Sequence, residues 1–204
     1  EISKKLASYS DCLELRDHSV MISNNLNPEL FHSDLQLIHP IDEISFSELE
    51  RIKVKFPSIK CVSFHAASIF AKPIVEKSIF STGKEKSTYD EMISCSIKNT
   101  VKIRKIFGQD IKILVENNNY YDTPAYEIVT DPEFISKVVY ENGLYFLFDI
   151  AHAKITAHNK GISYETYKSS LPLDKLLQVH ICKFGIRKDG TAFAAHHIPD
   201  RVEF

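Results

Sequence analysis

The stretch "FLFDIAHAK" (residues 146–154) decides the fold class of this chain. A run of large apolar residues ends directly at Asp149, and His152 follows three positions later. A short, unbroken apolar run is typical of a strand that is buried on both faces of a parallel sheet. A carboxylate and an imidazole at its end fit either a solvent-exposed turn or a metal site, and the rest of the sequence decides between them.

The composition indicates an ordinary globular protein. The chain has 204 residues, of which 44% are hydrophobic and 25% are charged, so one domain over residues 1–204 is the simplest expectation. The formal net charge of −2 gives no general attraction to nucleic acid or to an anionic membrane. Nucleic acid is therefore not an expected partner.

Other features concern location and completeness. No apolar run approaches the roughly 20 residues that span a bilayer, and no signal-peptide core is present. The four cysteines are scattered without a CxxC pair, which favours reduced thiols and a cytoplasmic location. The chain begins without methionine and an apolar alternation starts in "HHIPDRVEF" near its end, so we expect a fragment of a longer chain.

Apolar runs alternate with helical patterns along the chain. The alternation predicts βαβ units and a parallel sheet covered on both faces. The expected strands are residues 12–15, 35–38, 60–64, 111–115, 144–148 and 176–179. The expected helices are residues 45–56, 88–108, 131–143 and 163–170.

The helix over residues 88–108 has the clearest pattern. Thr88 and Glu91 have the spacing of a capping box. Ile93, Ile97 and Val101 repeat every four residues, which predicts one apolar stripe facing the core.

The other helices have recognisable end signals. Ser45 or Ser47 is the expected N-cap of the first helix. Asp131 is the expected N-cap of the third helix, with Pro132 in its first turn and a glycine at its end. The stretch "STGKEKST" (residues 81–88) is the best candidate for a mobile loop.

Potential metal ligands follow five of the expected strands. Since the carboxyl ends of parallel strands lie on one face of a barrel or doubly wound sheet, we expect these side chains to converge. They are His39, His65, Glu116, Asp149 and His180.

Further histidines could join this face. His152 lies shortly after Asp149, and His196 and His197 follow "TAFAA", a plausible sixth strand. Imidazole and carboxylate ligands together suit Zn, Fe or Mn, whereas Ca and Mg prefer oxygen alone. A lone histidine at a strand end is more often structural, but unpaired buried carboxylates would be costly, so the pattern predicts a shared metal site.

Several other residues have two interpretations. The run "NNNYY" (residues 117–121) could position a substrate or form a turn. The polar residues 158–160 could contact an anionic substrate or be solvated. We interpret Glu14 as structural, although it could reach the floor of the site, and His32 as a surface residue.

The order Glu116, Asp149-x-x-His152, His180 and a later histidine resembles the xylose isomerase-like TIM barrels, which include endonuclease IV and sugar isomerases and epimerases. The stretches "ILVENNNYY", "EFISKVVYENGLYFLFDIAHAKITAHNKGI" and "LPLDKLLQVHI" are also similar to a branch with multinuclear iron oxygenases that act on cysteine-containing peptides. The similarity covers about residues 60–200. It implies an α/β fold, a (β/α)8 TIM barrel of which only six or seven units are represented here.

The resemblance also implies a ligand set. Glu116 would bridge, His39 and His65 would bind one ion, Asp149 and His180 a second, and His152 with His196 a third. Two or three divalent ions (Zn, Fe or Mn) would follow, with Glu116 and His152 as candidate catalytic residues. The chain departs from the family pattern at Ala194, where an aspartate is usual, and in lacking the closing glutamate within its 204 residues.

The leading functional expectation is a divalent-metal-dependent enzyme acting on a small-molecule or peptide substrate. Sugar or sugar-phosphate isomerisation or epimerisation is the first candidate, and a peptide-modifying multinuclear iron oxygenase is the alternative. An endonuclease acting on abasic DNA would need a basic surface and a steep salt dependence. A non-catalytic decayed barrel is a further alternative, indicated by Ala194.

Overall fold

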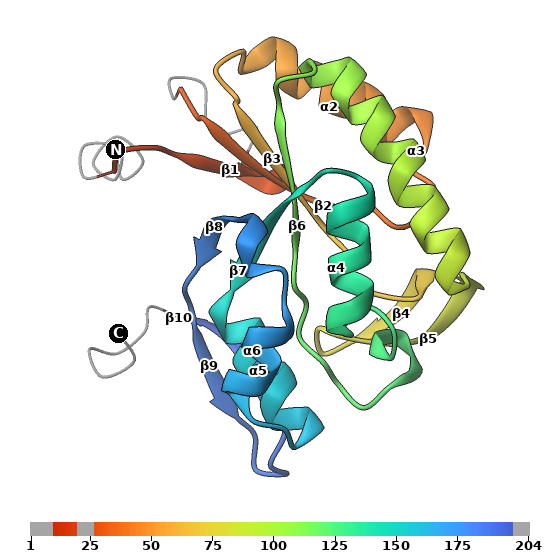
Figure 1. Cartoon of the computed structure of the whole chain (residues 1–204), viewed down its shortest axis with the longest axis vertical. Coiled ribbons are helices and arrows are strands. Elements are labelled where there is room, and N and C mark those ends of the chain that lie inside the picture. The colour runs from red at the N-terminus through yellow and green to blue at the C-terminus, as the bar shows by residue number, and fades with distance from the viewer. Residues whose placement is uncertain (1–9, 20–26, 198–204) are drawn as a thin grey trace.

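Six parallel strands form the main sheet, in the order β1-β2-β3-β6-β7-β8. The computed structural model describes residues 10–19 and 27–197. The strands are β1 (Glu14–Arg16), β2 (Leu30–Gln36), β3 (Cys61–His65), β6 (Lys112–Glu116), β7 (Tyr145–Asp149) and β8 (Leu176–His180). The sheet curls, and the helices wrap around its outside (Figure 1). The expected α/β class and parallel barrel-type sheet are confirmed, and the described residues form a half-barrel.

The helices follow the strands as the alternation predicts. They are α2 (Glu43–Lys55), α3 (Tyr89–Phe107), α4 (Pro132–Glu141), α5 (Ile150–Lys160) and α6 (Tyr164–Ser170). Short 3-10 helices are η1 (Asp17–Ser19), η2 (Pro124–Tyr126) and η3 (Leu173–Lys175). No helix in the described ranges is long and apolar enough to cross a membrane.

The helix caps largely match the sequence signals. Thr88 and Glu91 form the complete capping box, and Asp131 caps α4 with Pro132 in its first turn. The expectation for α2 is wrong, because Asp42 is its N-cap and accepts a hydrogen bond from Ser45 N at 2.7 Å. The helix therefore starts three residues earlier than a Ser45 cap would place it, and five earlier than a Ser47 cap would.

The expected apolar stripe of α3 is confirmed for Ile93, which is buried, and is wrong for Ile97 and Val101. Ile97 and Val101 are 41% and 49% exposed, and polar Ser96 and Asn99 are buried instead. Asn99 Nδ2 donates to the carbonyl oxygens of Leu37 and His39 at 2.8 and 2.7 Å. Asn99 is buried on this face because it satisfies backbone atoms of the loop after β2, and Ser96 bonds the carbonyl of Ile93 and accepts from Asn142.

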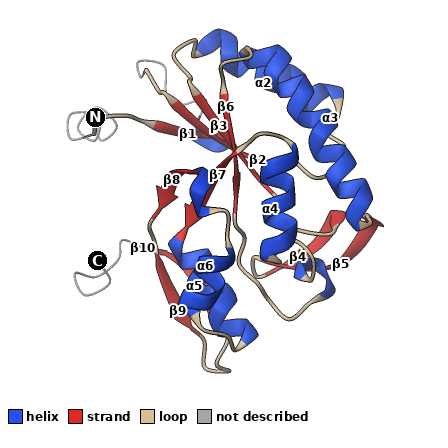
Figure 2. Cartoon of the chain, in the orientation of Figure 1, coloured by secondary structure: helices blue, strands red, loops and turns tan. Residues whose placement is uncertain are grey.

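Two antiparallel hairpins lie beside the parallel sheet, which Figure 2 shows as separate pairs of strands. β4 (Phe70–Glu76) pairs with β5 (Ile79–Lys86), so the loop expected at residues 81–88 is wrong. β9 (Lys183–Ile186) pairs with β10 (Ala192–His197), so "TAFAA" is not a sixth parallel strand. Both hairpins lie toward the carboxyl ends of the parallel strands (Figure 1).

The main core lies between the sheet and its helices. It contains Phe64 and Phe146 from the strands and Phe134 and Val138 from α4, all fully buried. Edge strand β8 differs from these central strands, because side chains such as Val179 are 42% exposed. The half-barrel is thus well packed between the sheet and its helices, and edge strand β8 is partly exposed.

Candidate metal centre

Strand register brings four of the expected residues together. His65 on β3 and Glu116 on β6 are register partners, and so are Asp149 on β7 and His180 on β8. Parallel strands place such partners side by side on the same face of the sheet. For these four residues, the strand ends therefore lie together as expected, although they are far apart in the sequence.

Glu116 lies at the centre of the group and is only 3% exposed. Its Oε1 is 3.0 Å from His180 Nδ1, and its Oε2 is 3.1 Å from His65 Nδ1. Oε2 is buried and no hydrogen bond in the described residues is directed at it. A buried carboxylate oxygen without a hydrogen bond lowers the free energy of unfolding unless a cation or a hydrogen-bond donor approaches it.

The electrostatics of the group favour ionised Glu116. Burial alone would raise its pKa, but the hydrogen bond with His180 and the nearby His65 and His152 outweigh burial and hold the pKa well below its usual range. Burial would lower the pKa of His180, but hydrogen bonds to Glu116 and Glu14 raise it to about 9. Without a metal, a protonated His180 thus lies between two carboxylates and offsets part of their charge.

His32 belongs to this group, and the interpretation of it as a surface residue is wrong. It lies in β2 with 0% exposure. Its Nδ1 is 2.7 Å from Ser63 Oγ, and its Nε2 is 3.0 Å from His65 Nε2 and 3.5 Å from Glu116 Oε2. Burial and the neighbouring His65 contribute to lowering the pKa of His32 to about 3, so the ring is neutral and able to bind a cation.

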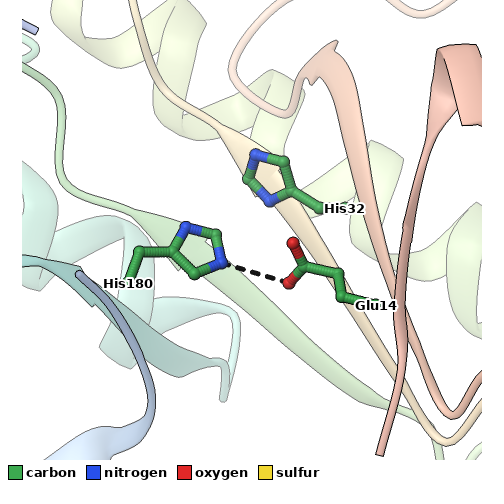
Figure 3. A group of neighbouring side chains, drawn as sticks. All are labelled: Glu14, His32 and His180. Carbon is green, nitrogen blue, oxygen red and sulfur yellow. Dashed lines mark hydrogen bonds and ion pairs between the residues drawn. The ribbon is translucent and has the colours of Figure 1, made fainter. Parts of the chain in front are cut away.

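Glu14 completes the group from edge strand β1. Its Oε2 lies 3.1 Å from His180 Nε2 (Figure 3). It also accepts a hydrogen bond from Gln178. Burial would raise the pKa of Glu14, but the hydrogen bond and charge of His180 lower it overall. Glu14 therefore faces the site, unlike the structural role that we expected.

Three overlapping trios of ligand atoms result. They are Glu14–His32–His180, His32–His65–Glu116 and Glu116–Asp149–His180, and the ligand atoms of each trio lie within 4.8 Å of one another. Figure 3 shows the side chains of the first trio pointing toward a common centre. Atoms bound to one ion at about 2.0–2.2 Å are at most about 4.4 Å apart, so small side-chain adjustments would suffice. The Glu116 oxygen that receives no hydrogen bond in the described residues and the mixed nitrogen and oxygen donors fit a divalent transition metal or zinc.

His152 lies at the edge of the group. Its Nδ1 is 2.9 Å from the carbonyl oxygen of Asn117 and 3.9 Å from Glu116 Oε1, and its Nε2 is 3.9 Å from Asp149 Oδ2. Asp149 is the N-cap of α5, because its Oδ1 accepts from His152 N. The same carboxylate thus begins the helix and faces the site with its second oxygen.

Asn117 fixes the position of Asp149. Its Nδ2 donates to the Asp149 carbonyl at 3.0 Å, and its Oδ1 accepts from Asp149 N at 2.8 Å. The next residue, Asn118, lines the neighbouring cavity and donates to the carbonyl of Ala67. The asparagine run thus holds the strand ends in place and also reaches the cavity.

The remaining expected residues lie elsewhere or are not described. His39 belongs to none of the trios, because its Nε2 bonds the carbonyl of Ser68 at 2.8 Å and its Nδ1 lies 3.2 Å from Ser87 Oγ. β2 ends before His39, so a histidine inside the strand, His32, reaches the centre instead. His196 lies in β10, and its side chain is outside the described part of the chain.

A cavity of about 700 Å³ opens next to the cluster. The carboxylates and imidazoles line one part of it, and Tyr121, Tyr126 and Phe193 line another. Lys77 and Arg187 bring positive charge to it from the two hairpins. The cavity therefore combines a potential metal centre with aromatic and cationic surfaces that suit a substrate.

Solved structures with the same fold include sugar epimerases. The chain resembles 3-keto-D-glucoside 4-epimerase of E. coli with a TM-score of 0.52 and 14% identity, over 81% of this chain and 65% of that one. It resembles D-psicose 3-epimerase of Clostridium cellulolyticum with a TM-score of 0.53 and 10% identity, over 88% of this chain and 66% of that one. This likeness establishes the xylose isomerase-like TIM-barrel fold.

Sequence comparison gives the family. The chain is 24% identical over 99 residues to a UPF0276 protein of Vibrio parahaemolyticus, covering 48% of this chain and 34% of the relative. It is 31% identical over 77 residues to a UPF0276 protein of Paraburkholderia phytofirmans, covering 38% and 25%. The chain thus spans about a third or less of the length of these curated relatives. The model of the RiPP precursor modification enzymes MbnB/TglH/ChrH matches residues 87–200, more than half of the chain, and the chain belongs to this family.

Proposed function

We propose that this chain contributes the metal centre of an enzyme that modifies a peptide precursor. Membership of a family of RiPP precursor modification enzymes supports a peptide substrate, since RiPPs are ribosomally made peptides that are modified afterwards. The observation that carries the proposal is Glu116, a buried carboxylate shared by two ligand trios, with one oxygen that lies beside two histidine rings and receives no hydrogen bond in the described residues. We further propose that residues 1–204 lie within one barrel domain.

The described residues provide ligands for at least two ions. We assign His32, His65 and Glu116 to one ion, and Glu116, Asp149 and His180 to a second. Glu14 with His32 and His180 is a third combination of the same donors. Bound iron would supply redox chemistry, and bound zinc or manganese would polarise a substrate oxygen.

We assign catalytic roles to Glu116 and His152. The carbonyl of Asn117 can only accept a hydrogen bond, so a neutral His152 carries its proton on Nδ1 and a lone pair on Nε2. His152 lines the cavity, so Nε2 could take a proton from a bound substrate or serve as a further ligand. Glu116 stays ionised beside His152, so its negative charge would offset the positive charge of bound cations and of a protonated His152.

Sugar epimerisation is the competing function. It is supported by the fold of the epimerases, but identities of 10–15% carry the fold and not the reaction. A peptide substrate has the additional support of the family match over residues 87–200.

The test uses the full-length protein purified without chelator. Elemental analysis should find bound iron, zinc or manganese, and mass spectrometry should find a changed mass in one member of a panel of synthetic peptides with and without cysteine. Glu116→Gln should lose both the metal and the conversion. Glu127→Gln, at an exposed carboxylate outside the cavity, should keep both.

Two results would overturn the proposal. One is a metal-loaded protein that epimerises ketohexoses and leaves every peptide unchanged. The other is a protein that binds no metal at stoichiometric levels after purification and reconstitution.

A further inference from the structure

Helix α5 fixes the β9–β10 hairpin beside the metal centre. Asn159 near the end of α5 accepts from Ala192 N at 2.8 Å and donates to the Ala192 carbonyl at 3.1 Å. His158 Nε2 bonds the carbonyl of Gly190, in the hairpin turn, at 2.8 Å. The same helix begins at Asp149 of the ligand cluster, so one rigid element positions both the cluster and the hairpin (Figure 1).

The hairpin presents an arginine on an aromatic support. Phe193 on β10 and Gly185 on β9 are register partners. A Cβ atom at Gly185 would lie 2.8 Å from the Phe193 ring, so only glycine lets the ring pack directly on the β9 backbone. The guanidinium carbon of Arg187 lies 5.3 Å from the centre of this ring. The stack limits the freedom of the guanidinium group, which reduces the entropy lost when it binds a ligand.

Arg187 lines the same cavity as Glu116, Asp149 and His180. It forms none of the salt bridges found within residues 10–19 and 27–197, whereas the other cavity arginine, Arg16, lies 3.5 Å from Glu14. The cavity carboxylates of the cluster are surrounded by histidines. Arg187 therefore lines a substrate-sized space without a salt bridge to any carboxylate in the described residues, although its charge lowers the pKa of exposed Asp189 and Asp34 also lines the cavity.

We propose that Arg187 binds a carboxylate group of the substrate and thereby orients it toward the metal centre. A guanidinium group forms two parallel hydrogen bonds to a carboxylate, which gives orientation as well as affinity. The inference rests on the proposed function, because a peptide offers a carboxylate at its C-terminus or on an Asp or Glu side chain. Phe193 and Asn159 act as positioning residues through the hairpin.

The experiment measures equilibrium binding to the full-length, metal-loaded protein by calorimetry. The probes are a short acetylated peptide with a free C-terminal carboxylate, its C-terminal amide, and the amide with one added glutamate. We expect one or both carboxylate forms to bind at least about tenfold more tightly than the neutral amide, as for a charge-assisted hydrogen bond. The preferred form identifies the source of the carboxylate.

Matched variants locate the effect. Arg187→Gln should abolish the preference for the carboxylate forms with no change in metal content, and Arg187→Lys should retain part of it because lysine keeps the charge but not the planar fork. Lys188→Gln removes a neighbouring exposed charge outside the cavity and should retain the full preference.

Three results would overturn the inference: equal binding of neutral and carboxylate peptides, an Arg187→Gln variant that keeps the preference, and no binding of any probe. A sugar phosphate whose affinity depends on Arg187 more than that of any peptide would also overturn it. Failure of the proposed function looks different. In that case no peptide changes mass, yet the binding preference and its loss in Arg187→Gln remain.

Discussion

Glu116 Oε1 lies 3.0 Å from His180 Nδ1, although the two residues are 64 positions apart in the chain. The contact joins β6 to β8 across the intervening strand β7, whose Asp149 is the register partner of His180. Each side chain reaches the centre because its strand ends there. The site is therefore a property of the sheet as a whole and not of a local motif.

Removing His180 should release metal from the protein. His180→Ala deletes a donor shared by two trios, so bound metal should fall by about one ion per chain, with the far-UV circular dichroism preserved. His18→Ala is the control, because His18 has a side chain that is 76% exposed and belongs to no trio. Elemental analysis of both proteins checks the result, and full metal content in His180→Ala would remove this residue from the site.

His32 and His39 should respond differently to substitution. His32→Ala should lower metal content, since His32 belongs to two trios. His39→Gln should keep the metal, since its ring bonds the Ser68 carbonyl outside the cluster. Elemental analysis of the two variants in parallel distinguishes the positions, and equal loss in both would mean that His39 also contacts the ion.

His39 should also make the stability of the protein depend on pH. Burial lowers the pKa of His39 below 6.5, although its hydrogen bond to Ser68 opposes this. Below about pH 6.5 the unfolded chain therefore takes up a proton that the folded chain does not. The free energy of unfolding should fall with decreasing pH, by at most about 1.4 kcal/mol per pH unit from this group.

Urea denaturation of metal-free protein between pH 7.5 and pH 5 measures this dependence. His32, whose pKa is lowered to about 3, contributes with the same sign, whereas His180, whose pKa is raised to about 9, contributes with the opposite sign above about pH 6.5. The loss of stability through His39 and His32 should therefore dominate below about pH 6.5. His39→Gln should lose only the share of His39 and give a shallower slope. Parallel slopes for the two proteins would contradict the assignment.

Asn117→Ala should destabilise the strand end that carries Asp149. It leaves the buried N–H and carbonyl of Asp149 without their side-chain partners, at a cost of about 2–4 kcal/mol in the free energy of unfolding. Weaker metal binding should follow, because Asp149 is no longer fixed. Asn119→Ala is the comparison, since Asn119 bonds only the hydroxyl of Tyr121 among described groups, and denaturation should show a smaller loss for it.

Much of the central fold could be predicted from the sequence. The buried strands that end at Glu116 and Asp149 are short apolar runs with clear helices on either side. Their short length favours a strand over a buried helix. Convergence of the strand ends then followed from parallel topology alone. The same reasoning predicted His65 and His180 near Glu116, and the structure places them within hydrogen-bonding distance.

The early strands could not be predicted in the same way. β2 has the sequence LFHSDLQ, in which His32, Ser33 and Asp34 interrupt the apolar pattern. Leu37 and Ile38 are more apolar and fully buried, but they lie in the connection after the strand. Because these two residues are buried without belonging to a strand, the sequence predicted a strand that ends just before His39. The actual strand contains His32, which was therefore not recognised as a site residue.

The hairpins were missed for a different reason. The turn between β4 and β5 has Lys77 and Ser78 at φ 50 and 63, where asparagine and glycine are usual, so no turn signal is visible in the sequence. Ala192–His197 has the apolar content of a strand, but only the pairing with β9 reveals that it is antiparallel. Arg187 could not have been connected to the cavity without that pairing.

The two outer strands of the half-barrel, β1 and β8, are linked through side chains. Glu14 reaches Gln178 and His180 over a separation of 164 and 166 residues, without a backbone ladder between the two strands. The link between the two edge strands of the sheet is thus made by side chains of the group that would bind a cation. Binding or loss of a cation at this centre would therefore change how tightly the two edge strands are held to each other.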